Sequence, residues 1–199
     1  MAPGGFLSIA LRRNAGSRAL AFTLPTSDGG HKVLLPSTEN VQVRFIDITM
    51  FAADMGVTNV PNDHEEAHNF LPRAFTQDKR MFDLAICDAQ VLRTHARASY
   101  REAREASRLT TTQLALGLGN LKEGGTMSVL LHKVEAWRTV RLLHQFSKFS
   151  NVRLFKPLKA HTTRSSFYMV ASHIRPLHIE AVRATEEWRR TWKLATFGT

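Results

Sequence analysis

The sequence predicts an α/β protein in which helices cover both faces of a mostly parallel sheet. Short apolar runs alternate along the chain with stretches of helical periodicity. Two of these runs, Phe82–Cys87 and Met127–Leu131, are almost continuously apolar, which is typical of strands covered on both faces. With 199 residues, 43% of them hydrophobic, the chain can bury one substantial core. We therefore expect one domain over residues 1–199.

The first 80 residues predict one helix, two strands and an irregular insertion. A helix follows Gly4 and Gly5 and ends at the Asn14–Ser17 cluster, before a strand at Ala19–Leu24. Alternating apolar residues predict a half-buried strand over Val41–Ile48. Residues 49–80 are polar and show no sustained period, so we expect an irregular insertion with at most a short helix.

The rest of the chain alternates strands and helices. Phe82–Cys87 reads as a fully buried strand. A glycine pair, Gly124 and Gly125, is expected to end a helix before the next strand. The expected helices are 89–107, 110–121, 134–149 and 176–193, and the expected strands are 127–131, 152–155 and 166–172. Trp188 and Trp192 lie four residues apart on the last helix and are expected in the core.

Charge points to a polyanionic partner. The net charge is +10, and residues 92–199 hold 19 Lys and Arg against 7 Asp and Glu. Such an excess favours nucleic acid or an anionic surface. A single cysteine, Cys87, excludes an internal disulfide and a cysteine-rich zinc site, and the histidines lack metal-ligand spacing, so we expect no metal.

Targeting signals are weak. No apolar run reaches the roughly 20 residues that span a bilayer, so no membrane is expected. The first 27 residues hold Arg12, Arg13 and Arg18 and no acid, as in a mitochondrial transit peptide, but a core helix followed by a strand explains them better. We expect an intracellular protein, cytoplasmic or nuclear, with a mitochondrial location as the alternative.

The opening glycine pair can hold an anionic ligand group. Gly4 and Gly5 stand at a helix N-terminus, where backbone N–H groups favour negative charge and glycine allows close approach. The loop is not G-x-G-x-x-G, and Thr23 stands where a dinucleotide-binding fold carries an acid after the next strand. A nicotinamide oxidoreductase is therefore disfavoured.

Five short motifs in order resemble the FtsJ-like RNA methyltransferases. The segment Ala2-Pro3-Gly4-Gly5-Phe6 resembles the family's methionine-binding loop, and Asp47 before Ile48 is similar to its adenine-contacting acid. Asp88, after the strand Phe82–Cys87, resembles its catalytic aspartate. Lys122–Thr126 is similar to the turn before its lysine strand, and Lys156-Pro157 with Arg164–Ala171 resembles its terminal segment.

The resemblance implies a Rossmann-like methyltransferase fold that uses S-adenosylmethionine to methylate RNA ribose 2'-hydroxyls. Asp88 and Lys133 would be catalytic, although Lys133 lies further past Gly125 than the family pattern suggests and can equally be a strand-end cation. The family's glutamate is replaced by Ser166, which cannot carry a charge. Cofactor contacts would come from Pro3, Gly4, Gly5, Phe6, Thr23, Asp47, Ile48 and Asp88.

The family's first, central strand has no counterpart in the sequence, because Met1 already lies in the methionine-binding motif. We therefore expect an N-terminally truncated form of the domain. Without that strand, the strands at 19–24 and 82–87 would flank a gap with unpaired backbone groups.

Two basic clusters are candidate RNA contacts. Arg93, Arg97, Arg101, Arg104 and Arg108 recur at helical spacing after Asp88; the bland alternative is a face paired internally, as Arg101 with Glu105. The second cluster surrounds the terminal motif and comprises Lys156, Lys159, His161, Arg164 and the neighbouring Ser166. The sequence thus favours an RNA methyltransferase, with a catalytically impaired protein that binds RNA or a protein partner as the alternative.

Overall fold

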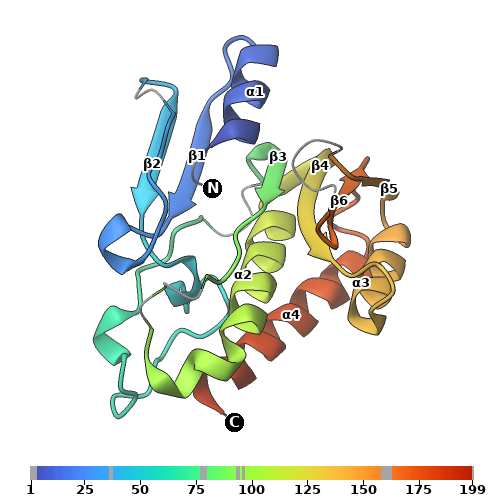
Figure 1. Cartoon of the computed structure of the whole chain (residues 1–199). Coiled ribbons are helices and arrows are strands. Elements are labelled where there is room, and N and C mark those ends of the chain that lie inside the picture. Colours follow the sequence, from blue (N-terminus) through green and yellow to red (C-terminus); the bar gives the residue numbers. More distant parts are fainter. Residues whose placement is uncertain are drawn as a thin grey trace.

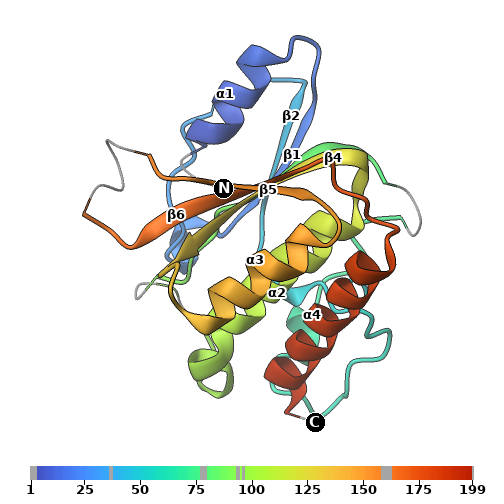
Figure 2. The same cartoon turned by 90° about the vertical axis from the view of Figure 1, so that its right-hand side faces the viewer.

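A sheet passes between helices on both sides, as the sequence predicts (Figure 2). The computed structural model describes residues 4–35, 38–76, 80–92, 95, 97–157 and 163–198. Helix α1 (Gly5–Arg13) covers one side of the sheet, and α2 (Glu105–Gly119), α3 (Trp137–Ser147) and α4 (Ile179–Phe197) cover the other. The fold is therefore the expected α/β arrangement.

The strands form two separate groups (Figure 1). Strand β1 (Ala19–Thr23) pairs in parallel with β2 (Val41–Phe45). The second group has the order β3-β4-β6-β5, made from β3 (Phe82–Cys87), β4 (Leu121–His132), β5 (Asn151–Phe155) and β6 (Ser166–Ser172). Strands β3 and β4 are parallel, and β6 is antiparallel to both of its neighbours. Among the described residues no strand joins β1 to β3, so the expected gap is present.

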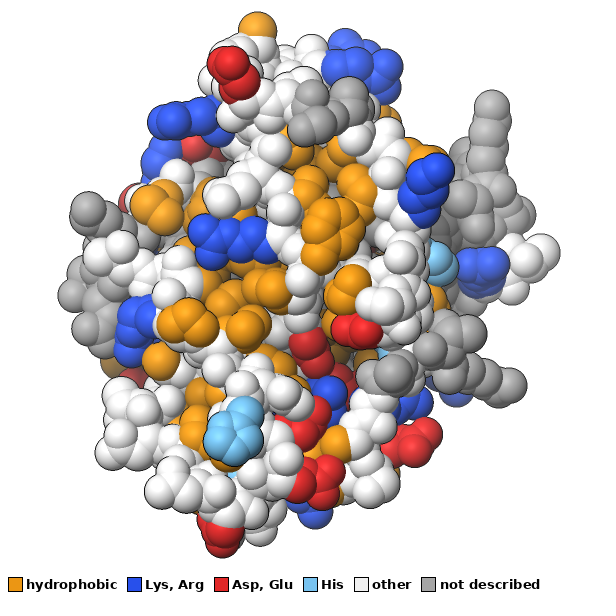
Figure 3. Space-filling view, turned by 90° about the vertical axis from the view of Figure 1, so that its left-hand side faces the viewer, with side chains coloured by type: hydrophobic (Ala, Val, Ile, Leu, Met, Phe, Trp, Pro, Cys, Tyr) orange, Lys and Arg blue, Asp and Glu red, His pale blue; other side chains and the backbone are white. Residues whose placement is uncertain are grey.

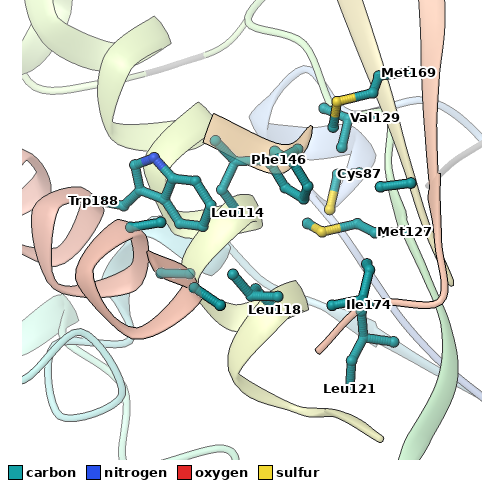
Figure 4. Packing of buried hydrophobic residues seen from close by; sticks show 14 of the residues in the cluster. Cys87, Leu114, Leu118, Leu121, Met127, Val129, Phe146, Met169, Ile174 and Trp188 are labelled. Carbon is teal, nitrogen blue, oxygen red and sulfur yellow. The ribbon is translucent and has the colours of Figure 1, made fainter. Parts of the chain in front are cut away.

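The core lies between the second sheet and α2, α3 and α4 (Figure 4). Met127 and Met169 from the sheet, Leu118 from α2 and Phe146 from α3 are at most 1% exposed. Trp188 and Trp192 are also buried, which confirms the predicted core stripe on the last helix. Each such side chain contributes on the order of 2 kcal/mol by leaving water.

The insertion at 49–80 packs closely against the helices. Apart from the 3₁₀ turns Ile48–Met50 and Ala67–Asn69, its described residues form no helix or strand. Phe51 and Met55 are nevertheless at most 3% exposed. The Asp54 carboxylate accepts backbone hydrogen bonds from Ala74 and Phe75 at 2.8 and 3.2 Å, which closes the segment on itself.

Two sequence-based boundaries and the expected burial of one strand are wrong. The helix expected over 89–107 begins only at Glu105, where α2 starts, and a 3₁₀ segment (Ser99–Arg104) precedes it. Helix α2 ends at Gly119, so Gly124 and Gly125 do not stop it but lie inside β4. Strand β3 is only partly buried, with Leu84 41% exposed, because one edge faces the gap and not another strand.

Candidate functional site

A cleft of about 690 Å³ opens between the two sheets. Residues 19–22 of β1 and 82–87 of β3 face each other across it, and one side of α1 closes it through Phe6, Leu7, Ala10 and Leu11. Asp88 and Ile48 line the end where the strands finish. In open α/β sheets ligands bind at the carboxyl ends of the strands, so this end of the cleft is the candidate site.

Apolar surface extends over the half of the molecule that carries β1 and β2. Figure 3 shows that side, with hydrophobic side chains in the middle of the face. Leu34 and Phe45 are 69% and 53% exposed. The β1–β2 pair is thus covered less completely than the second sheet.

The N-terminus of α1 has the geometry of an anion-binding loop. Gly4 has a φ of 104°, and a Cβ there would lie 2.6 Å from the Leu35 side chain, so only glycine fits. Gly5 faces open space, since an added Cβ would meet nothing within 4 Å. Among the residues that the structure describes, no side chain caps this helix, which leaves its first N–H groups to favour a carboxylate. Pro3, also predicted here, lies outside the described residues.

Asp88 lies immediately after β3 and close to Tyr168. Burial and, secondarily, the Asp88 charge raise the pKa of the Tyr168 hydroxyl. The Phe6 ring packs edge-on against the Tyr168 ring with centroids 4.9 Å apart, which ties the glycine loop to the middle of β6. The structure therefore brings together three parts that the sequence predicted separately: the loop, the aspartate and the terminal motif.

Gln113 on α2 fixes the backbone that carries Asp88, a role that sequence reasoning missed. Its side-chain amide accepts from the Ala89 N–H at 2.9 Å and donates to the Ala89 carbonyl at 3.1 Å. The Cys87 thiol donates to the Gln113 carbonyl, and burial raises the pKa of this thiol, so it stays protonated. A lone glutamine in a helix gives no sequence signal for such a contact.

Lys133 lies outside the lining of the cleft that contains Asp88. Leu130 pairs with Tyr168 and His132 with Ser166 across β4 and β6, so these side chains share one face of the sheet. Lys133 follows the end of β4, has a φ of 51° and is exposed. It is not among the residues that line the cleft with Asp88. The catalytic role of Lys133 therefore stays a prediction. The β4 side chains on the same face of the sheet as Tyr168 are those of Leu130 and His132.

Asp47 holds a network of buried charges. One carboxylate oxygen accepts from the backbone and hydroxyl of Thr49 at 2.9 and 2.7 Å. The other oxygen accepts from the Arg101 guanidinium at 2.9 Å, and Arg101 also contacts Glu66 and Glu105 at 3.1 and 3.5 Å. If Asp47 contacts adenine as predicted, its carboxylate must use a lone pair that Thr49 and Arg101 do not occupy.

The five arginines do not form one exposed face, although Arg104 is exposed. Arg101 is 5% exposed and Arg108 is fully buried, with its guanidinium bonded to Glu105 and Thr196. Arg97 donates to the Leu92 carbonyl and to Glu102. These arginines face inward because the insertion and α4 cover them, as the alternative of internal pairing anticipated. Arg93 lies outside the described residues.

The terminal motif keeps its cations at the surface. Lys156 and Arg164 are exposed, and the Lys156 ammonium donates to the Arg164 carbonyl at 2.9 Å. Ser166 is 1% exposed inside β6. Lys159 and His161 lie outside the described residues. RNA contact by this cluster stays a prediction.

The described residues fit S-adenosylmethionine in part. The α1 N-terminus and the open space at Gly5 suit its carboxylate, and Ile48 gives the cleft an apolar wall for adenine. Thr23, at the end of β1, offers only a hydroxyl to the ribose. Within the described ranges no group of three or more His, Cys, Asp or Glu could hold a metal. No helix there is long and apolar enough to cross a membrane.

Comparison with known proteins places the chain in a family. No curated protein matches it significantly. Among solved structures, it is similar to a Streptococcus mutans protein described as a methyltransferase in complex with SAH, at 13% identity and a TM-score of 0.39, over 86% of this chain and 97% of that one. The model of the FtsJ-like methyltransferases matches residues 1–173, which include the glycine loop, Asp88 and β6. The chain therefore belongs to the FtsJ-like methyltransferase family.

Proposed function

We propose that this protein methylates ribose 2'-hydroxyls of RNA. S-adenosylmethionine is the cofactor of the family to which the chain belongs. The observation that carries the proposal is the position of Asp88, at the carboxyl end of β3, in the cleft that Phe6 also lines. The basic half of the chain, with exposed Lys156 and Arg164, supports a polyanionic substrate.

The proposed chemistry requires little more than orientation. When bound, the cofactor supplies an electrophilic methyl group. The α1 N-terminus and Gly5 would hold its carboxylate. Asp88 would accept a hydrogen bond from the attacking hydroxyl and draw off its proton as the new bond forms. Gln113 keeps the Asp88 backbone in place.

Replacement of Asp88 tests the assignment. Asp88→Asn preserves the shape of the side chain but removes its basicity, so we expect methyl transfer to RNA to fall by about 10²- to 10⁴-fold. The measurement is transfer of a labelled methyl group to RNA by purified protein. Asp63→Asn, at an exposed position in the insertion, is the matched control and should keep full activity. Transfer that survives Asp88→Asn would remove this site.

A second candidate function is binding without turnover. It is favoured by the position of Lys133 outside the cleft lining and by Ser166 in place of an acid. Titration calorimetry with S-adenosylmethionine separates the two candidates. Micromolar binding together with methyl transfer supports the enzyme, whereas RNA binding without cofactor binding or transfer supports the second candidate.

A further inference from the structure

A group of large apolar side chains lies exposed where α3 begins and β5 ends. Val134, Trp137, Leu154 and Phe155 are 47%, 78%, 51% and 53% exposed; we call them the Trp137 surface. Val134, Leu154 and Phe155 line a groove of about 390 Å³ together with Phe167. Trp188 and Trp192 are buried, so Trp137 is the exposed tryptophan of the chain. Exposed apolar groups of this kind mark binding surfaces.

Cations border the Trp137 surface, and no described carboxylate forms an ion pair with them. Lys133 and Arg138 flank it on the α3 side, and Lys156 and Arg164 on the β5 side, and all four are exposed. None of them forms an ion pair with a described residue, whereas the exposed Arg183 pairs with Glu180. The acidic residue that lines the groove is Glu135. The surface therefore combines apolar rings with positive charge that no described carboxylate pairs.

The Trp137 surface lies at the same edge of the sheet as Asp88. Phe155 pairs with Tyr168 and Tyr168 with Leu130, and both β4 and β5 run antiparallel to β6, so their ends meet at one edge. Asp88 follows β3 at this edge, three strand spacings from β5, or about 14 Å. Figure 2 shows β5 and α3 on the side facing the viewer. A polymer held at Asp88 can thus extend to the Trp137 surface.

We propose that Trp137 and Phe155 stack on unpaired bases of single-stranded RNA, next to the nucleotide presented to Asp88. This inference rests on the proposed function and names its substrate class. Aromatic rings beside cations that no described carboxylate pairs match a single strand, whose bases have free π-faces and whose phosphates are anionic. A duplex hides those faces, and a purely acidic partner would not need the rings.

Tryptophan fluorescence tests the proposal directly. A single-stranded oligoribonucleotide is expected to quench the emission of Trp137, while a duplex of the same sequence or heparin should bind with little quenching. Trp137→Ala and Phe155→Ala should each weaken single-strand binding about 5- to 100-fold, the range of one base–aromatic stack. Neither change should alter the salt dependence of binding, because no phosphate contact is lost.

Two controls sharpen the comparison. Leu177→Ala removes another exposed apolar side chain, 70% exposed, away from this surface and should leave RNA binding unchanged. Lys156→Ala should reduce the slope of log K against log salt by about 1, while Trp137 quenching persists at low salt.

The possible outcomes are distinguishable. Equal affinity of Trp137→Ala and the unchanged protein for single-stranded RNA, or equal quenching by duplex, would overturn the inference. Protection of Trp137 by a protein partner and not by RNA would do the same. Quenching without methyl transfer would leave the inference standing and remove the proposed reaction, whereas transfer without quenching would remove the inference alone.

Discussion

At the scale of single residues, Arg101 carries its charge inside the protein, between Asp47, Glu66 and Glu105. The guanidinium is 6% exposed and joins the end of β2, the insertion and α2. Its pKa is raised by the hydrogen bond and charge of Asp47 against the opposing effect of burial, so it stays protonated. This residue therefore fixes the predicted adenine-contacting aspartate to the helix layer.

Loss of this charge should be far more costly than loss of a surface charge. Arg101→Met removes the arginine partner of Asp47 and Glu66, while Glu105 keeps Arg108, and we expect the free energy of unfolding to fall by about 3–5 kcal/mol. Arg183→Met breaks an exposed pair with Glu180 and should lower the free energy of unfolding far less. Urea unfolding of both variants is the measurement. Equal effects would show that the Arg101 network adds no stability.

At the scale of elements, local patterns predicted strands better than the helices around them. The ranges 82–87 and 166–172 agree with β3 and β6, because short apolar runs bounded by polar residues have few other conformations. The helical spacing of the arginines mimicked an exposed helical face, but the ion pair from Arg101 to Asp47 and the hydrogen bond from Arg108 to Thr196 hold both side chains inside. Local periodicity contains no information about such long-range partners.

The prediction that the glycine pair Gly124 and Gly125 ends a helix was wrong for a related reason. Gly124 donates to the Ile174 carbonyl and Gly125 accepts from the Ile174 N–H, so both extend the strand through a segment far along the chain. Between Leu121 and Thr126 the pairing with β3 shifts register, which needs the φ of 77° at Gly124. A glycine pair after a helical pattern normally marks the end of a helix. Only the pairing with β3 shows that these two glycines lie in a strand.

Helix α2 depends on Gly117 for its contact with the sheet. A Cβ there would lie 2.7 Å from Met127 and 3.3 Å from the Cys87 sulfur, while a Cβ on Gly119 would meet nothing. Gly117→Leu should therefore lower the free energy of unfolding by about 1–3 kcal/mol through overpacking. Gly119→Leu, at the end of the same helix, should be neutral or slightly stabilising. Thermal unfolding compares them, and a neutral Gly117→Leu would contradict the close packing.

At the scale of the whole molecule, the divided sheet is the dominant feature. Two-stranded sheets are marginal by themselves, and the β1–β2 pair is held to the rest by aromatic contacts. The Phe22 ring meets those of Phe51 and Phe75 at centroid distances of 5.7 and 6.0 Å. The gap between β1 and β3 was predictable from the motifs, but the width and apolar lining of the cleft depend on how α1 and the insertion pack.

Hydrogen exchange at single amides shows whether the β1 edge is open in solution. The Ala19 N–H donates to the Asn40 carbonyl, and the Thr23 carbonyl accepts from the Ile46 N–H. The backbone N–H and C=O groups of residues 19, 21 and 23 therefore point toward β2. By alternation, the amides of Leu20 and Phe22 point into the cleft, where no described residue accepts them. We expect these two amides to exchange at least about 100-fold faster than Ala21, since only Ala21 must await opening of the β1–β2 pair. Equal protection of Leu20, Ala21 and Phe22 would mean that the cleft is closed by another strand or by direct pairing with β3.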